Sequence, residues 1–172
     1  MNDRPRRPAP PRIDPFNGVL LVDKPAGWTS HDVVAKIRST FRIKKVGHGG
    51  TLDPMATGLL PILIGKGTKL SDRIMGGDKT YEGTITLGAR TDSQDAEGTV
   101  LEEQDSSGIT ETALRQAMAA RVGDQMQTPP MVSAVKKDGV PLYKLARKGK
   151  SIEREPRFIH VYAFDLFDAV GT

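Results

Sequence analysis

Gly47-His48-Gly49-Gly50-Thr51-Leu52-Asp53-Pro54 is a glycine-rich loop that carries a single carboxylate. Its three glycines tolerate backbone conformations that other residues resist, so they predict a tight loop that a ligand can approach closely. Pro54 has a fixed φ and biases Asp53 towards an extended backbone, which limits where the carboxylate can point. Local chemistry leaves two interpretations open: a turn-forming or helix-capping aspartate, which is the commoner case, and a catalytic one.

The elements on either side of this loop are predicted from the spacing of apolar residues. Gly18 to Val22 reads as a buried strand that ends in a turn, and a second apolar run covers Leu59 to Ile64. A helix capped by Thr29 or Ser30 is expected between them. Its apolar residues recur at helical spacing on one face: Val33, Val34, Ile37 and Phe41. The loop therefore lies between a helix and an apolar run.

The second half of the chain mixes strands and helices. Thr80 to Leu87 alternates apolar and polar residues and predicts a half-buried strand. A helix capped by Thr110 is expected next, ending before Thr128-Pro129-Pro130, and its apolar residues on one side are Leu114, Ala117, Met118 and Val122. A strand over 131–137 and a turn at Asp138-Gly139 follow. The last expected elements are a short basic helix over 142–148, opened by Pro141, and a strand over 157–167. Without a regular βαβ repeat, the predicted class is α+β with a mixed, mainly antiparallel sheet.

Length and composition fit a soluble globular protein of one domain. The chain has 172 residues, of which 37% are hydrophobic and 27% charged, and no apolar run is long enough to cross a bilayer. It has no cysteine, which excludes disulfides, thiolate metal sites and cysteine nucleophiles. Residues 1–16 are rich in proline and arginine and have no apolar core, so they predict a disordered basic arm rather than a signal or transit peptide.

Charge is segregated along the chain, whose net charge is +4. Seven acids and no Lys or Arg lie between Asp92 and Glu111, whereas eight bases and three acids lie between Lys136 and Arg157. A third segment, His31 to His48, carries five bases against Asp32 alone. This segregation suggests a basic face for a polyanion, and the alternative is a set of separate solvated faces.

Several kinds of site are excluded by motif. His31, His48 and His160 have no ligand-like spacing, so no metal site is predicted. Gly65-Lys66-Gly67-Thr68-Lys69 departs from the order of a phosphate-binding loop, and no Gly-x-Ser-x-Gly elbow occurs. What remains, a loop aspartate, a neighbouring histidine, a tyrosine and basic segments, suits cofactor-free chemistry on a nucleic acid.

Several ordered blocks of sequence follow the arm. They are GVLLVDKPAGWTS (18–30), KVGHGGTLDPMATGLLP (45–61), KTYEG (79–83), LGARTDSQDAEG (87–98), QTPPMVSAVK (127–136) and LYKLARKG (142–149). Through these blocks the chain resembles the TruB family of tRNA pseudouridine synthases. So many blocks in order are far more specific than one loop motif.

The resemblance implies a pseudouridine synthase catalytic fold over residues 17–172 and conversion of a tRNA uridine to pseudouridine, with the T-loop position numbered 55 as the expected target. The reaction needs no cofactor. Asp53 matches the essential family aspartate, which acts as a nucleophile at the sugar or the base, or stabilises a cationic sugar. Because the target base lies inside the tRNA elbow, it must be flipped out.

Other roles follow from the same resemblance. His48 is expected beside the flipped base, and Tyr81 is expected to stack on the uracil. The residues expected to support the catalytic loop are Lys24, Pro25, Gly50 and Thr51. Those expected to contact RNA phosphates are Lys136, Lys144, Arg147 and Lys148.

The expected partner is the T-arm of tRNA, bound by a cytoplasmic monomer without an obligate protein partner or membrane contact. In the family, a later Gly-Thr-Tyr-x-Arg segment brings a tyrosine and an arginine to the active site, and a small RNA-binding domain often follows. The chain ends at Thr172 before either, so a truncated catalytic domain is expected. The alternative function is a catalytically silent RNA-binding or tRNA-chaperone remnant of the fold, and a guide-RNA-dependent relative is a weaker option.

Overall fold

The computed structural model describes residues 16–130, 136–137, 140–141 and 152–169. The contacts within the chain divide it into two compact units, residues 1–81 and 82–172, and each is described by itself. The assignment of residues 17–172 to one catalytic domain stays a prediction.

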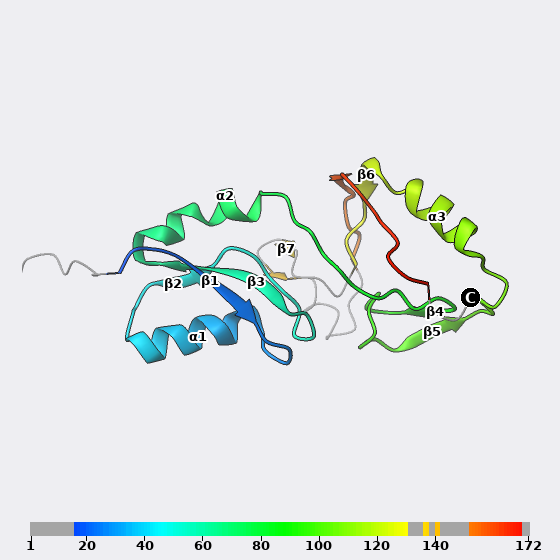
Figure 1. Cartoon of the computed structure of the whole chain (residues 1–172). Coiled ribbons are helices and arrows are strands. Elements are labelled where there is room, and N and C mark those ends of the chain that lie inside the picture. Colours follow the sequence, from blue (N-terminus) through cyan, green and yellow to red (C-terminus); the bar gives the residue numbers. More distant parts are fainter. Residues whose placement is uncertain (1–15, 131–135, 138–139, 142–151, 170–172) are drawn as a thin grey trace, which may run out of the picture. The chain divides into compact units, whose positions relative to one another are not determined.

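The first unit is built on a three-stranded antiparallel sheet in the order β1-β3-β2 (Figure 1). Its strands are β1 (Gly18–Lys24), β2 (Val46–His48) and β3 (Gly58–Ile64). The predicted strand over 18–22 is confirmed and extends to Lys24, while the apolar run over 59–64 forms the central strand. The predicted burial of β1 is wrong: Val19, Leu20 and Leu21 are exposed, and β1 is an edge strand of this sheet. Because Lys24 pairs with Gly58, β1 ends where β3 begins.

Helix α1 (Ser30–Phe41) covers one face of this sheet, as the apolar spacing predicts. Thr29 is its N-cap, and the side chains of Thr29 and Asp32 each accept a hydrogen bond from the other residue's backbone N–H. The Asp32 backbone N–H donates to the Thr29 hydroxyl oxygen at 3.1 Å, and the Thr29 backbone N–H donates to the Asp32 carboxylate at 2.8 Å. This capping box satisfies two backbone donors that a helix start leaves unpaired, so it fixes where α1 begins.

The opposite face carries a 3-10 helix, η1 (Gly65–Leu70), followed by α2 (Ser71–Met75). In Figure 1, α1 and α2 lie on opposite sides of the sheet. Successive strand residues point to opposite faces, which is why β3 buries both Ile62 and Leu63. A central strand covered on both sides accounts for the continuous apolar run of its sequence.

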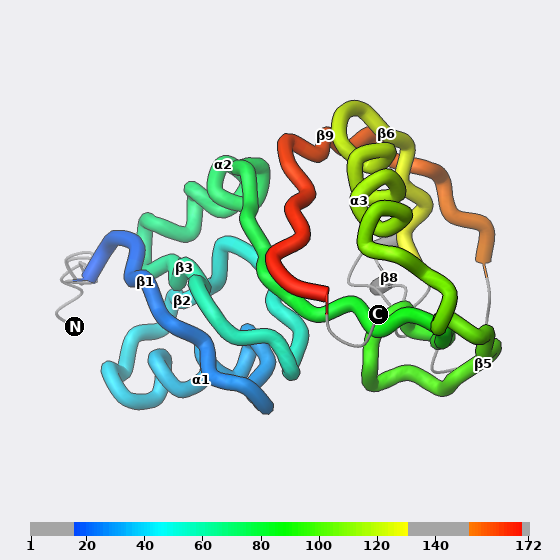
Figure 2. Tube along the Cα trace, turned by 45° about the vertical axis from the view of Figure 1, so that its right-hand side comes forward, coloured from blue at the N-terminus to red at the C-terminus, as the bar shows by residue number. Residues whose placement is uncertain are grey.

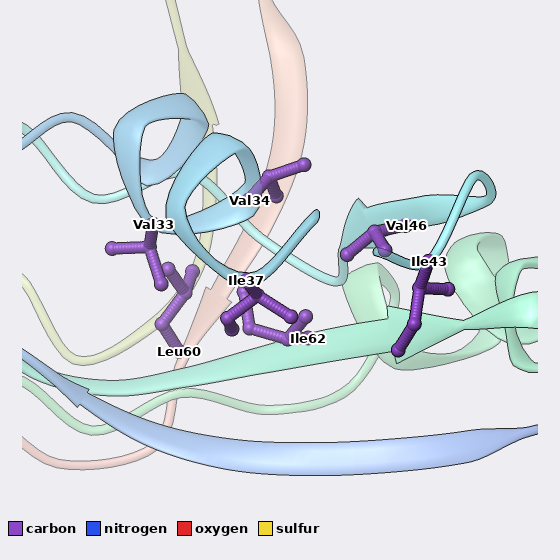
Figure 3. Packing of buried hydrophobic residues seen from close by; sticks show 7 residues of the cluster. All are labelled: Val33, Val34, Ile37, Ile43, Val46, Leu60 and Ile62. Carbon is purple, nitrogen blue, oxygen red and sulfur yellow. The ribbon is translucent and has the colours of Figure 1, made fainter. Parts of the chain in front are cut away.

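The core of the first unit lies between α1 and the sheet. Figure 3 shows the side chains of this core, which come from α1, from β2 and β3, and from the segment between α1 and β2. They are Val33, Val34, Ile37, Ile43, Val46, Leu60 and Ile62. Phe41, predicted on the same helix face, is exposed, because α1 ends there and the chain turns at Arg42.

The second unit has two small antiparallel sheets and one helix. Strand β4 (Ala89–Thr91) pairs with β5 (Val100–Glu103), and β6 (Gly123–Gln127) pairs with β9 (Arg157–Val161). Helix α3 (Glu111–Ala119) leads into β6, and Figure 2 traces this path. Thr110 caps α3 as predicted, with its hydroxyl accepting from the Ala113 backbone N–H.

A third pair of short strands also belongs to this unit. Strand β7 (Lys136–Lys137) pairs antiparallel with β8 (Val140–Pro141). The predicted turn at 138–139 and the predicted helix over 142–148 lie outside the described residues, as does most of the strand expected over 131–137. The α+β class and the antiparallel pairing are confirmed, although the described sheets are small and separate.

Three predictions for local structure are wrong. Residues 80–87 form no strand, and Tyr81 and Ile85 are exposed, because no described strand pairs with this segment and no layer covers its apolar side. Helix α3 ends at Ala119 rather than before Pro129, since β6 intervenes and pairs with a distant strand. The last strand ends at Val161 instead of 167, because Val161 pairs with Gly123, the first residue of its antiparallel partner β6.

Replacing Ile62 with alanine is expected to lower the free energy of unfolding by about 2–5 kcal/mol, because Ile62 is 0% exposed and its truncation leaves a cavity. Chemical denaturation followed by circular dichroism measures this. Leu21→Ala on the same sheet is the control: Leu21 is 64% exposed, so its loss changes stability by no more than about 0.5 kcal/mol. Equal losses in both variants would contradict the assigned core.

Acid is expected to weaken the capping box of α1. Hydrogen bonds from the side chain and backbone of Thr29 lower the pKa of Asp32 below its ordinary value. The carboxylate therefore stabilises the fold above the pKa of the unfolded chain, and this contribution disappears as pH falls through the lower folded value. The stability difference between wild type and Asp32→Asn should be largest near neutral pH and should narrow below about pH 4. Thermal unfolding across pH measures it, with Asp23→Asn as control; a difference independent of pH would contradict the prediction.

Candidate active site in the loop between β2 and β3

Asp53 lies in the loop of residues 49–57, which connects β2 to the central strand β3. Its side chain is exposed and makes no hydrogen bond or ion pair with any residue that the structure describes. The Asp53 carbonyl oxygen accepts from the Ala56 backbone N–H at 3.1 Å, which closes a turn around Pro54. A carboxylate on a structured turn and open to solvent is available to a substrate.

The first fixed point of the loop is Gly49. Its backbone N–H donates to the Pro61 carbonyl on β3 at 2.8 Å. A Cβ atom at Gly49 would lie 2.6 Å from the Cγ2 atom of Ile74 in α2, which is too close, so glycine is required for packing. The neighbouring Gly50 has no atom within 4 Å of such a position, so no packing demand accounts for glycine there.

The second fixed point is Ser30, at the start of α1. Its side chain is buried, and its hydroxyl oxygen accepts from the Leu52 backbone N–H at 2.9 Å. The hydroxyl also donates to the Leu52 carbonyl at 3.4 Å. Ser30 thus holds both backbone groups of the residue before Asp53. The sequence suggested Ser30 only as a possible cap, because its spacing to Leu52 carries no local signal.

The third fixed point is Lys24, at the end of β1, whose side chain is 0% exposed. Its ammonium donates to the carbonyl oxygens of Trp28 at 2.6 Å, Pro25 at 3.0 Å and Pro54 at 3.2 Å. The Gly27 backbone N–H donates to the same Pro54 carbonyl at 2.8 Å. One buried cation therefore joins the loop after β1 to the residue that follows Asp53.

His48 and Tyr81 differ in their surroundings. His48 is the last residue of β2 and pairs with Ile62; its ring is half-buried, and its Nδ1 atom is buried without a hydrogen-bond partner among the described residues. Tyr81 is 72% exposed and belongs to no strand, contrary to its expected place on a strand face. The expected roles of both side chains stay predictions.

Apart from His48 and Tyr81, the predicted site residues fall into two groups. Those that the structure brings to one end of the first unit are Lys24, Pro25, Gly50, Thr51 and Asp53. Of the four expected phosphate contacts, Lys136 lies in β7, where only the backbone is described, and Lys144, Arg147 and Lys148 lie outside the described residues.

Within the described ranges, no group of three or more His, Asp or Glu side chains is arranged to hold a metal ion. None of the helices in that part of the chain is long and apolar enough to span a membrane. A shallow hollow lined by Gly88, Arg90 and Gln104 in the second unit contains none of the predicted site residues.

Comparison with known proteins identifies the family. Residues 38–171 match the model of the TruB family pseudouridylate synthases, N-terminal domain. The chain belongs to this family. The resemblance read from the ordered sequence blocks is therefore confirmed, and the candidate loop lies within the matched residues.

Curated relatives agree with this assignment. The chain is 61% identical over 151 residues to tRNA pseudouridine synthase B of Opitutus terrae, and the match covers 88% of this chain and 63% of that protein. It is 50% identical over 162 residues to the protein of the same name from Ralstonia pickettii, covering 94% of this chain and 50% of that protein. The chain thus spans between half and two thirds of the length of these relatives.

A solved structure supports the fold. This chain matches one chain in a crystal structure of a Cbf5-Nop10-Gar1 complex, with a TM-score of 0.56 and 28% sequence identity. The match covers 90% of this chain and 36% of the other.

Removing the buried cation is expected to loosen the candidate loop. In Lys24→Met, the carbonyls of Trp28 and Pro25 lose the Lys24 donor, whereas that of Pro54 keeps the Gly27 N–H. Each buried group left unpaired costs about 1–3 kcal/mol. The free energy of unfolding should fall accordingly, and the Gly27 and Leu52 amides should exchange with solvent faster. Hydrogen exchange and denaturation measure both effects. Lys36→Met, on the exposed side of α1, is the control; unchanged exchange at both amides would show that Lys24 does not hold the loop.

Proposed function

We propose that this chain carries the catalytic loop of a tRNA pseudouridine synthase, which converts the T-loop uridine numbered 55 to pseudouridine with Asp53 as the nucleophile. The observation that carries the proposal is an exposed carboxylate, without a partner among the described residues, on a loop held by Gly49, Ser30 and Lys24. Family membership and the names of the curated relatives support it.

The reaction breaks the bond between ribose C1′ and uracil N1 and forms one between C1′ and C5. The proton on C5 leaves to water and N1 gains one, so the change is an isomerisation without oxidation or reduction. A carboxylate oxygen of Asp53 attacks either the sugar or the base, and the covalent bond that it forms breaks again when the product is complete. Neither alternative requires a metal or an organic cofactor.

Positioning is what the loop contributes to this chemistry. A nucleophile that is already oriented avoids part of the entropic cost of bringing the reacting groups together. Backbone hydrogen bonds at Leu52 and Pro54 hold the residues on both sides of Asp53, so the carboxylate keeps its side-chain freedom while its backbone is fixed.

The remaining groups would bind the substrate. His48, the last residue of β2 before the loop, would contact the flipped base. Tyr81 would stack on the uracil. The basic residues Lys136, Lys144, Arg147 and Lys148 would contact phosphates of the T-arm. We further propose that the protein acts as a monomer in the cytoplasm.

Asp53→Asn is expected to abolish isomerisation, with a rate loss of at least about 10³-fold, because the amide cannot act as the nucleophile. Tritium released from tRNA transcript labelled at uracil C5 measures the reaction. Asp72→Asn, which removes another exposed carboxylate of the same unit, should retain the wild-type rate.

Circular dichroism and tRNA binding provide the folding control for both variants. A folded wild-type chain that binds tRNA but releases no more tritium than Asp53→Asn would overturn the catalytic proposal. That result would favour the silent RNA-binding alternative.

A further inference from the structure

The only tryptophan of the chain, Trp28, lies in the loop that follows β1 and is 38% exposed. Neither a ring contact nor a hydrogen bond involves its indole within the described part of the chain. Single exposed apolar residues are common on protein surfaces, so the location of Trp28 matters more than its exposure.

Trp28 adjoins the loop that carries Asp53. The carbonyl oxygens of Trp28 and Pro54 both accept from the Lys24 ammonium, at 2.6 and 3.2 Å, so the two loops meet at one nitrogen atom. Met55, which follows Pro54, is exposed as well. The two loops therefore bring an exposed indole and a second exposed apolar residue to the end of the sheet where Asp53 lies (Figure 1).

The backbone that carries this indole is fixed. The Trp28 carbonyl oxygen accepts from Lys24, and the N–H of the same peptide unit, which belongs to Thr29, donates to the Asp32 carboxylate at 2.8 Å. Both polar groups of this peptide unit are thus bonded within the protein. Because tryptophan has only two side-chain torsions, a ring on a fixed backbone loses little conformational freedom when a ligand stacks on it.

Local stability explains an apolar residue at this position but not its size. Trp28 precedes Thr29, the N-cap of α1, and an apolar residue there often packs against the fourth residue of the helix, which is Val33. Leucine or isoleucine would make the same contact and leave less apolar surface in water. The exposed part of the indole is therefore available for another purpose.

The charges of the two loops favour a nucleobase over a phosphate as the ligand. Residues 25–29 and 49–57 contain one acid, Asp53, and no Lys or Arg, and Asp32 lies in the first turn of the helix that follows the first loop. Carboxylates repel a phosphate, whereas an uncharged base stacks on an aromatic ring whatever its sequence. Because the flipped uracil is assigned to Tyr81, the bases beside it in the RNA remain for Trp28.

We propose that Trp28 is a substrate-binding residue on which a base next to the target uridine stacks. The inference rests on the proposed function, which supplies the RNA and the place of its reacting uridine. Flipping a nucleotide out of the RNA breaks the stacking between its base and the neighbouring ones. A neighbouring base that stacks on the indole regains part of the lost energy, so Trp28 stabilises the opened substrate.

The fluorescence of this single tryptophan tests the contact directly. Every protein in the experiment carries Asp53→Asn, so that binding is measured without turnover. The probes are a T-arm hairpin RNA and two hairpins that lack the base on the 5′ or the 3′ side of the target uridine. The intact hairpin should quench the emission, and one of the two abasic hairpins should not. Unquenched emission at saturating RNA would overturn the proposal, as would equal quenching by all three.

Binding measured by the anisotropy of labelled hairpins gives the energetic test. Trp28→Leu should bind the intact hairpin about 5- to 150-fold more weakly, the range expected for the loss of one stacked base. Trp28→Phe keeps a ring and should retain most of the affinity. Phe167→Leu removes another exposed aromatic, in the second unit, and should bind like the parent.

The abasic hairpins separate stacking from folding. On the hairpin that lacks the stacked base, Trp28→Leu and the parent should bind equally, because the contact is already absent. Leucine can still pack against Val33, so the thermal stability of Trp28→Leu should stay close to that of the parent. An affinity loss in Trp28→Leu that is the same on all three hairpins would show that the indole stacks on neither neighbouring base.

Failure of the proposed function gives a different result. In that case the wild-type chain releases no more tritium than Asp53→Asn, while quenching by the intact hairpin and its loss with one abasic hairpin persist. Tritium release by a chain whose tryptophan is not quenched would instead overturn the role of Trp28 alone.

Discussion

The first unit depends on one buried ammonium group. A cation removed from water must have each of its donors satisfied, or its burial becomes strongly unfavourable. Lys24 meets this requirement with three carbonyl oxygens and no carboxylate. Two of them belong to the loop after β1 and the third belongs to Pro54, so neither loop can move without leaving the ammonium short of an acceptor. The position of the backbone beside Asp53 is therefore coupled to the folding of β1.

Sheet topology makes this contact possible. Lys24 ends β1 and pairs with Gly58, which begins β3, so the loops next to these residues leave the sheet at the same end. Helix α1 starts at this end too, and its first residue, Ser30, reaches the backbone of Leu52. The antiparallel register thus gathers three segments around the candidate nucleophile. It also sends the end of α1 and the start of η1 to the other end of the sheet.

Sequence patterns predicted the first unit better than the second. Local signals were sufficient for β1 and for α1 with its Thr29 cap, because helical spacing and the capping residue are encoded within a few residues. Alternation at 80–87 predicted a strand that is not formed, since a strand also needs a partner that local spacing does not specify. For the same reason β6 escaped prediction: its pairing with β9 joins residues thirty or more positions apart. For Asp53, local chemistry left two interpretations, and only the ordered family blocks favoured catalysis.

The length of β3 isolates the charge of Asp53 from the cations at the far end of the sheet. These cations are Arg42, Lys44, Lys45, Lys66 and Lys69. Exposed charges interact weakly beyond a Debye length, which is about 8 Å at physiological ionic strength. The strand β3 separates these cations from the Asp53 loop by about 20 Å, more than twice that length. They therefore leave the charge of the Asp53 carboxylate unneutralised. An exposed carboxylate and a group of cations can coexist in one small unit because its sheet keeps them at opposite ends.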